Sequence, residues 1–394
     1  MIVDLHAHYP MHVVPGKRPS VARIARVAEA MNLRDRIRVW LINFASRFAN
    51  WQSFFSGPRV RIEYMREGEV QVVLSVLYSF WDEVDVVHGA LPRRGYLHTL
   101  EAQLDTIETR IRSQHAQDAT IAHDRRELAA ARAAHRLALI HCIEGGFHLG
   151  PDPNAMDGIV ERLANLGVAY ITLAHLIYRD VATDAPALPF LSDAEYQHWF
   201  PQPATGLTDI GRAAVRAMVK HGVLVDVAHM SDRSRDETFD LLDKLDPDRS
   251  VPVFASHAGY RFGSQEYMLP PEAITKIKER DGVVAIIFAT HQLDDGLPKR
   301  RPHLSPRARF QASIDELCAH IDAIHKVTGS HRHTAIGSDF DGFIKPTLPG
   351  IEDMRAMRRV EAALRHRYGN ADGDLICSRN ALRLLDAGWA GRQP

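Results

Sequence analysis

The stretch GLTDIGRAAVRAMVKHGVLVDVAHMS, residues 206–231, contains the pattern from which the fold of this protein is predicted. Its segment 209–221 carries apolar residues at helical spacings and stops at Gly222, the residue type that most often ends a helix. The β-branched run 223–227 follows without polar alternation, which is typical of a parallel strand buried on both faces. The stretch therefore predicts a helix, then a buried strand, with His229 just beyond the strand.

The same alternation extends along the whole chain. Short apolar runs predict eight strands, at 2–5, 70–77, 137–143, 168–173, 223–227, 251–255, 283–288 and 333–336. Segments of helical character separate most of them, including the charged, Ala-rich segment 97–134 and the amphipathic segment 307–327. Thr208, Ser305 and Ser313 are candidates for local caps or turns. This order predicts an α/β fold, a single (β/α)8 TIM barrel that forms one domain over residues 1–394.

One region interrupts the alternation, a helical excursion at about 17–66 between the first two strands. It carries an aromatic stripe at spacings of three and four residues: Trp40, Phe44, Phe48, Trp51 and Phe55. We interpret the stripe as the apolar face of a helix packed on the barrel. A lid over the active site, a dimer contact and a membrane-surface helix are the alternatives.

The composition excludes several classes of partner. With 48 Lys plus Arg against 49 Asp plus Glu, the net charge is −1, so we expect no nucleic-acid partner. No run approaches the roughly 18 apolar residues that span a bilayer, and the start MIVDLHAHYP is unlike a signal peptide. The three scattered cysteines cannot build a disulfide framework or a Cys-based zinc site. A cytoplasmic location is therefore expected.

Polar residues that suit a metal follow six of the predicted strands. Histidine follows four strands and carboxylates follow two others: His6 and His8, Glu144, His175, His229, His257 and Asp339. In a parallel barrel these positions meet at the C-terminal face, where barrel enzymes carry their chemistry. Each histidine alone is more often a hydrogen-bonded rim residue. Together they predict a metal site, and imidazole and carboxylate are ligands that suit zinc.

The spacing suggests how two ions would be held. His6 and His8 are two apart on an extended chain, so both side chains point to one side and can bind one ion. His229 and His257 provide a second pair, and Glu144 has two oxygens with which to bridge both ions. Two zinc ions bridged by a carboxylate and a water or hydroxide activate that water for hydrolysis.

Two further residues have predicted catalytic roles. Asp339 would take a proton from the water and pass it to the leaving amine, although the sequence DFDG at 339–342 also resembles a tight turn, a role we assign to Asp341. His175 fits neither metal pair and would donate to the substrate carbonyl oxygen as negative charge develops there. A buried, hydrogen-bonded core histidine is the alternative for His175.

At this point the chain resembles the renal (membrane) dipeptidase family, zinc dipeptidases on an amidohydrolase-type barrel. The resemblance runs from the first predicted strand to the C-terminus, and the 17–66 region interrupts it. Its motifs are residues 206–231 quoted above, VPVFASHAG at 251–259, HTAIGSDFDGF at 333–343, IEGG at 143–146, TLAHL at 172–176 and SRNALRLL at 378–385.

The resemblance implies specific roles for residues of this chain. His6 would bind the first metal, His229 and His257 the second, and Glu144 would bridge them. His175 would contact the scissile carbonyl and Asp339 would shuttle the proton. Relatives are often dimers, so a homodimer is open.

The sequence departs from the family at two positions. His8 stands where the family has an aspartate, which raises the net charge of the metal site and should make its water more acidic. The family's arginine for the substrate carboxylate is missing from SQEYMLPP at 264–271. Arg261 lies nearby and is the candidate replacement, with a surface salt bridge as its alternative role.

These observations predict a zinc-dependent dipeptidase that cleaves small dipeptides. An amidohydrolase acting on an N-acyl amino acid, a lactam, a lactone or another small amide is the alternative. The His-x-His opening also occurs in phosphoesterases of the polymerase-and-histidinol-phosphatase type, but the strand ends show no Arg or Lys cluster for phosphate. A non-catalytic metal-binding barrel is the third alternative, and Asp339 argues against it because a structural metal site needs no proton shuttle.

Overall fold

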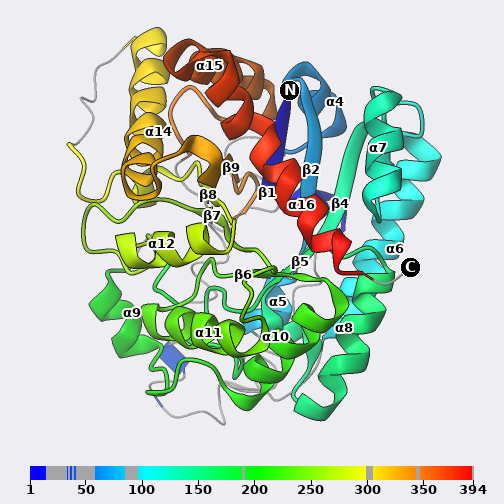
Figure 1. Ribbon diagram of the computed structural model, residues 1–394, viewed down its shortest axis with the longest axis vertical. Coiled ribbons are helices and arrows are strands. Elements are labelled where there is room, and N and C mark those ends of the chain that lie inside the picture. The colour runs from blue at the N-terminus through cyan, green and yellow to red at the C-terminus, as the bar shows by residue number, and fades with distance from the viewer. Residues whose placement is uncertain are drawn as a thin grey trace.

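A computed structural model describes residues 1–14, 58–84, 96–188, 191–298, 305–342 and 347–392, together with residues 33, 36, 37 and 40. Its centre is a closed barrel of eight parallel strands surrounded by helices (Figure 1). The strands are β1 (Ile2–Ala7), β2 (Val70–Leu77), β4 (Leu137–Glu144), β5 (Tyr170–Thr172), β6 (Leu224–Asp226), β7 (Val253–Ala258), β8 (Val284–Ile286) and β9 (Thr334–Ile336). They pair in the order β2-β1-β9-β8-β7-β6-β5-β4, and pairing of β2 with β4 closes the ring. The predicted TIM barrel is confirmed.

The segment 97–134 differs from the prediction of a single helical segment. It contains α6 (Leu97–Gln114), a short strand β3 (Ala119–Ile121) and α7 (Arg125–Ala133). Strand β3 pairs with the first half of β4, on the edge opposite β2, and lies outside the closed ring. Three residues are too few to show a strand period in sequence, and the Ala-rich flanks obscured the break.

The remaining helices surround the barrel (Figure 1). They are α1 (Tyr9–Val13), α4 (Ile62–Glu67), α5 (Phe80–Val84), α8 (Met156–Asn165), α9 (Asp193–Trp199), α10 (Asp209–His221), α11 (Asp232–Leu245), α12 (Pro271–Glu279), α13 (Thr290–Leu293), α14 (Pro306–Thr328), α15 (Met357–Asp374) and α16 (Asn380–Ala390). Two predicted caps are present, because the side chains of Thr208 and Ser305 accept backbone N–H groups at the starts of α10 and α14. The prediction for Ser313 is wrong, because this residue lies inside α14, where its hydroxyl donates to the Pro349 carbonyl. Gly222 ends α10 in the left-handed conformation.

Strand β4 shows how the barrel divides its residues between two faces. Ala138, Ile140 and Cys142 pack with interior residues of the other strands, whereas Leu139 and Ile143 pack against the surrounding helices. Successive side chains on a strand alternate in direction, so Glu144 shares the inner face. His141 shares the outer face by the same rule.

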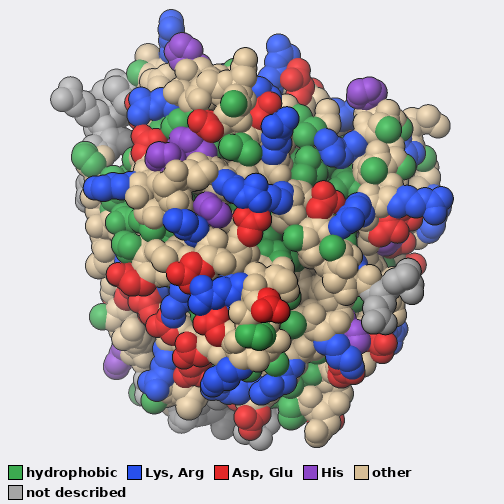
Figure 2. All heavy atoms as spheres, in the orientation of Figure 1, with side chains coloured by type: hydrophobic (Ala, Val, Ile, Leu, Met, Phe, Trp, Pro, Cys, Tyr) green, Lys and Arg blue, Asp and Glu red, His purple; other side chains and the backbone are tan. Residues whose placement is uncertain are grey.

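Most of the excursion at 17–66 lies outside the described residues, including Phe44, Phe48, Trp51 and Phe55 of the aromatic stripe. The described Trp40 has 61% of its surface exposed. The single domain and the packing of this insertion therefore stay predictions. No helix among the described residues is long and apolar enough to cross a membrane. The face in Figure 2 shows acidic and basic side chains interspersed, in keeping with the balanced charge.

Candidate metal centre

The structure brings all seven predicted histidines and carboxylates together at the C-terminal ends of the strands. His6 and His257 belong to β1 and β7, Glu144 ends β4, and the others follow β1, β5, β6 and β9: His8, His175, His229 and Asp339. All seven are buried, and Asp339 is the most exposed at 7%. This is the arrangement expected of the mouth of a barrel.

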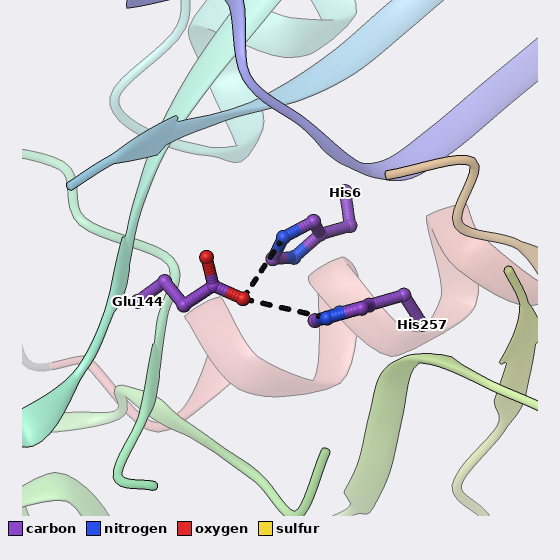
Figure 3. Close-up of side chains that lie close together, drawn as sticks. All are labelled: His6, Glu144 and His257. Carbon is purple, nitrogen blue, oxygen red and sulfur yellow. Dashed lines mark ion pairs between the residues drawn. The ribbon is translucent and has the colours of Figure 1, made fainter. Parts of the chain in front are cut away.

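Glu144 lies at the centre of the cluster. Its Oε1 is 3.3 Å from His6 Nε2 and 3.3 Å from His257 Nε2 (Figure 3). The same oxygen is 3.4 Å from His229 Nε2. Its Oε2 is 3.1 Å from His175 Nε2 and 3.4 Å from His8 Nε2. Burial alone would raise the pKa of the Glu144 carboxyl, but the neighbouring His175 and His6 hold that pKa well below its usual range. The carboxylate is therefore anionic.

The distances fit a metal better than direct hydrogen bonds. Tetrahedral zinc with bonds of about 2.0–2.1 Å places its ligands about 3.3 Å apart. The Nε2 atoms of His6 and His8 are 3.3 Å apart, those of His229 and His257 are 2.9 Å apart, and Asp339 Oδ1 is 3.0 Å from His8 Nε2. Both oxygens of Glu144 are buried, and apart from the ion pair of Oε2 with His175 they have no hydrogen-bond partner among the described residues. Such groups are costly unless something else binds them.

Hydrogen bonds behind the cluster fix which nitrogen each of two histidines presents. The Tyr170 hydroxyl donates to the Leu5 carbonyl, so it accepts from His6 Nδ1–H at 2.8 Å. The Ser256 hydroxyl donates to Asp226 at 2.6 Å, so it accepts from His257 Nδ1–H at 2.7 Å. Both rings therefore turn Nε2 toward Glu144, and the neutral ring with its proton on Nδ1 is the form that binds a metal through Nε2.

The sequence prediction did not include this supporting network. Asp226 also accepts the hydroxyl of Thr172 and the backbone N–H groups of Ala228 and Ser256. Its position on β6, three residues before the ligand candidate His229, was the available signal in VDVAHMS. Identifying Tyr170 and Ser256 required knowledge of which strands are neighbours.

The predicted division into two metal pairs is not marked by the geometry alone. His6 groups with His8 and Asp339, and equally with Glu144 and His257. Glu144, His175 and His229 form a further group close enough to hold an ion. Asp339 is thus near enough to serve as a ligand as well as a proton carrier.

Backbone conformation aims two of these side chains. His229 and Asp339 have φ angles of +62° and +56°, in the left-handed region that non-glycine residues rarely adopt. Such backbones cluster at functional sites. Asp341, with φ of +64°, accepts the backbone N–H groups of Arg59 and Val60, consistent with the turn role predicted for it.

His175 has a buried partner that the sequence prediction missed. Glu83 on α5 accepts His175 Nδ1–H at 2.7 Å, and its other oxygen accepts the backbone N–H groups of Leu176 and Ile177. Burial alone would lower the pKa of His175, but Glu144 and Glu83 together raise that pKa well above its usual value. The ring is therefore an imidazolium. A glutamate soon after the second strand, in FWDEV at 80–84, was the available signal.

A small cavity opens onto the cluster. It is lined by His8, His175, Leu176, Ala187, His229, Tyr267, His291, Gln292 and Asp339. Neither ring nitrogen of His291 has a hydrogen-bond partner among the described residues, and burial lowers its pKa to about 4, so the ring is neutral. No lysine or arginine belongs to the described lining.

Arg261 lies outside that lining. Its guanidinium donates to both oxygens of Asp232, at 2.7 and 2.8 Å, and to the carbonyl oxygens of Glu266 and Met268. A substrate carboxylate would have to displace Asp232 from this fork. The role of Arg261 in substrate binding stays a prediction.

The fold and the cluster together define a barrel protein with a histidine- and carboxylate-rich metal centre at its mouth. A sequence model of the membrane dipeptidase family, peptidase family M19, matches residues 21–389. The chain belongs to this family. His6 and His8 precede the matched residues.

Individual relatives agree with this membership. An uncharacterized dipeptidase of Schizosaccharomyces pombe is 29% identical over 249 residues, 61% of this chain and 51% of the relative. Dipeptidase tcpJ of Claviceps purpurea is 25% identical over 308 residues, 77% of this chain and 62% of the relative. The chain thus spans about half to three-fifths of the length of these relatives.

Solved structures share the fold. The crystal structure of dipeptidase AC, a family M19 metallopeptidase, superposes on this chain with a TM-score of 0.65 and 18% identity. The superposition covers 98% of each of the two chains. A metallopeptidase of Rhodobacter sphaeroides, liganded with a phosphinate mimic of the dipeptide L-Ala-D-Ala, covers 98% of this chain and 99% of its own, with a TM-score of 0.68 and 18% identity.

Proposed function

We propose that this protein is a zinc-dependent dipeptidase that hydrolyses the amide bond of small dipeptides. The observation that carries the proposal is the fixed orientation of His6 and His257, whose Nε2 atoms converge on an anionic Glu144. Without a metal, Glu144 Oε1 is buried with no hydrogen-bond partner among the described residues. Two zinc ions bound there would polarise the substrate carbonyl and make an acidic, nucleophilic water available at neutral pH.

The ligand roles are those predicted from the sequence. His6 and His8 would hold one ion, His229 and His257 the other, and Glu144 would bind both. Glu144 suits this role because its carboxylate lies within 3.4 Å of both pairs, with Oε1 near His6, His229 and His257 and Oε2 near His8.

Asp339 would carry the proton. Its Oδ1 is buried, lines the cavity and has no hydrogen-bond partner among the described residues. A carboxylate in that place can accept a proton from the attacking water and return it to the leaving amine nitrogen. The strained backbone at Asp339 keeps the side chain turned toward the cluster.

His175 would stabilise the developing oxyanion. It is charged, lines the cavity and is held in place at Nδ1 by Glu83, while its Nε2 lies 3.1 Å from Glu144 Oε2, beside the place where the substrate carbonyl would bind. A preorganised charged donor stabilises negative charge better than one that must reorient during the reaction.

The dipeptide as substrate is supported by relatives named dipeptidases and by the L-Ala-D-Ala mimic bound to the Rhodobacter sphaeroides structure. One observation favours a second candidate. Because no arginine or lysine belongs to the described cavity lining, a substrate with a blocked or absent carboxylate, such as a lactam or another small amide, would lose little binding. His291 and Gln292 offer neutral hydrogen-bonding groups there.

The test is metal analysis of the purified protein combined with a substrate screen. We expect about two zinc ions at the barrel centre of each chain and cleavage of L,L- or L,D-dipeptides. The variant Asp339→Asn should keep its metal and lose about 10²–10⁴-fold in kcat. A metal-loaded protein inactive on a broad dipeptide panel would refute the dipeptidase proposal, and activity on lactams alone would support the second candidate. The homodimer and the cytoplasmic location stay predictions of the sequence.

A further inference from the structure

A second cluster of metal-ligating side chains lies on the outer face of the barrel. Glu108 projects from α6, His123 precedes α7, and His141 lies on β4. These elements pack together beside β3 (Figure 1). His141 and Glu144 share β4 but lie three residues apart on opposite faces, about 10 Å along the strand. The outer cluster is therefore separate from the metal centre inside the barrel.

The three side chains converge on one point. Glu108 Oε1 is 2.9 Å from His123 Nε2 and 3.6 Å from His141 Nε2. These values bracket the spacing of about 3.3 Å between ligands of a tetrahedral zinc ion. One ligand atom from each residue lies within 4.8 Å of the other two.

His141 is the independent sign that the cluster binds something. Its side chain is completely buried, and neither ring nitrogen has a hydrogen-bond partner among the described residues. Buried polar groups are nearly always satisfied, and an orphaned one costs about 1–3 kcal/mol. The distance of 3.6 Å to Glu108 is too long for a hydrogen bond, but it suits two ligands of one ion.

Glu127 completes the surroundings of His123. The Glu127 carboxylate lies 2.7 Å from His123 Nδ1 and also accepts the backbone N–H of His123. Glu127 is fixed in the first turn of α7, where Asp124 caps the helix. A carboxylate behind a ligating histidine orients the ring and makes it a stronger ligand, which is the usual arrangement in zinc proteins.

An ion pair alone explains only part of this cluster. A protonated His123 between Glu108 and Glu127 satisfies those three groups. It leaves both nitrogens of His141 without a partner and gives no reason for a buried histidine at that place. A metal ion bound between the three side chains gives His141 Nε2 a partner as well.

We propose that Glu108, His123 and His141 form a second zinc site on the outside of the barrel, with Glu127 orienting His123. The ligand set of two histidines and one carboxylate suits zinc and other borderline divalent metals. The cluster borders a surface pocket lined by residues of α6, β3 and α7, including Glu108, His123 and Glu127. Three protein ligands beside a pocket leave the fourth position to water or a small ligand.

The test counts zinc in the full-length protein at a free zinc concentration that saturates the barrel centre. We expect the wild type to bind one ion more than the variant Glu108→Gln/His123→Gln, whose changed residues are both partly exposed. Anomalous scattering from zinc in crystals should give a peak between Glu108, His123 and His141.

Two further variants make the test specific. Glu127→Gln keeps all three ligands and should weaken zinc binding at this site about 10–100-fold. His98→Gln removes an exposed histidine from the same helix α6 and should leave the zinc count unchanged. Equal zinc counts in the wild type and the double variant, or no anomalous peak at the cluster, would overturn the proposal. Either result is independent of whether the barrel centre hydrolyses dipeptides.

Discussion

Replacement of Glu83 by glutamine tests whether a buried carboxylate keeps His175 charged. In the wild type, one oxygen of Glu83 accepts His175 Nδ1–H and the other accepts the N–H groups of Leu176 and Ile177. A glutamine must keep its oxygen toward those two N–H groups, so its NH2 faces His175. Two donors cannot face each other, and the ring would therefore lose its Nδ1 proton and its charge.

The expected loss of kcat in Glu83→Gln follows from the hydrogen bond that His175 can still donate. Neutral His175 still donates from Nε2, so only the difference between a charged and a neutral hydrogen bond to the oxyanion is lost. Charged hydrogen bonds contribute about 1.5–3 kcal/mol and neutral ones about 0.5–1.5 kcal/mol. A loss of about 1.4 kcal/mol corresponds to a tenfold lower kcat. KM and metal content should change little, because the side-chain partners of Glu83 among the described residues are Tyr78 and His175, and neither is a predicted metal ligand.

A double-mutant cycle shows whether Glu83 acts through His175. His175→Ala should lower kcat about 10²–10³-fold, and adding Glu83→Gln to it should have no further effect. Glu361→Gln is a control, since this buried glutamate pairs with Met1 and Arg365 and its loss should leave kcat unchanged. Additive effects of Glu83→Gln and His175→Ala, or wild-type kcat in Glu83→Gln, would refute the reasoning.

Three further predictions concern charge, metal and stability. His8→Asp should move the acidic limb of the kcat–pH profile to higher pH, because an anionic ligand makes the site's water less acidic; an unmoved limb would contradict this. Chelation should lower the melting temperature in calorimetry, and zinc should restore it, because Glu144 and its histidines lose their partner; an unchanged melting temperature would show that no metal was bound. Asp246→Asn should cost about 1–3 kcal/mol in urea unfolding, because the buried Arg280 loses this partner and keeps its ion pair with Asp243. Burial alone would raise the pKa of Asp246, but the N–H groups of Val251 and Ser250 with Arg280 hold it below the usual value. Its contribution is therefore present above about pH 4 and lost on acidification, so Asp246→Asn should flatten the acid limb of the stability curve.

Much of the fold could be predicted because buried parallel strands leave a strong local signal. The run 70–77 was predicted with the bounds of β2, and 209–221 with those of α10. The extension of β1 to Ala7 and the strand β3 were missed. Strand ends are weakly encoded, since pairing with a neighbouring strand rather than local preference decides where a strand stops.

The seven residues of the cluster could be predicted because the order and direction of the strands could be predicted. Once strands are known to be parallel in a barrel, residues after each strand must meet, and this brought His6 and Asp339 together across more than 300 residues of sequence. Glu83 and Tyr170 were not predicted, because a residue that acts through another side chain has no motif of its own.

The sequence by itself determined the barrel and the kinds of side chain at its mouth, because the pattern of apolar runs is local and residue identity is given. Only the tertiary structure decided how those side chains are used. It set the tautomers of His6 and His257 through Tyr170 and Ser256, and it tied Arg261 to Asp232. Protonation and hydrogen bonding change when the distance between two polar atoms changes by a fraction of an ångström. The atoms belong to residues far apart in the chain, and spacing in the sequence does not encode their distance.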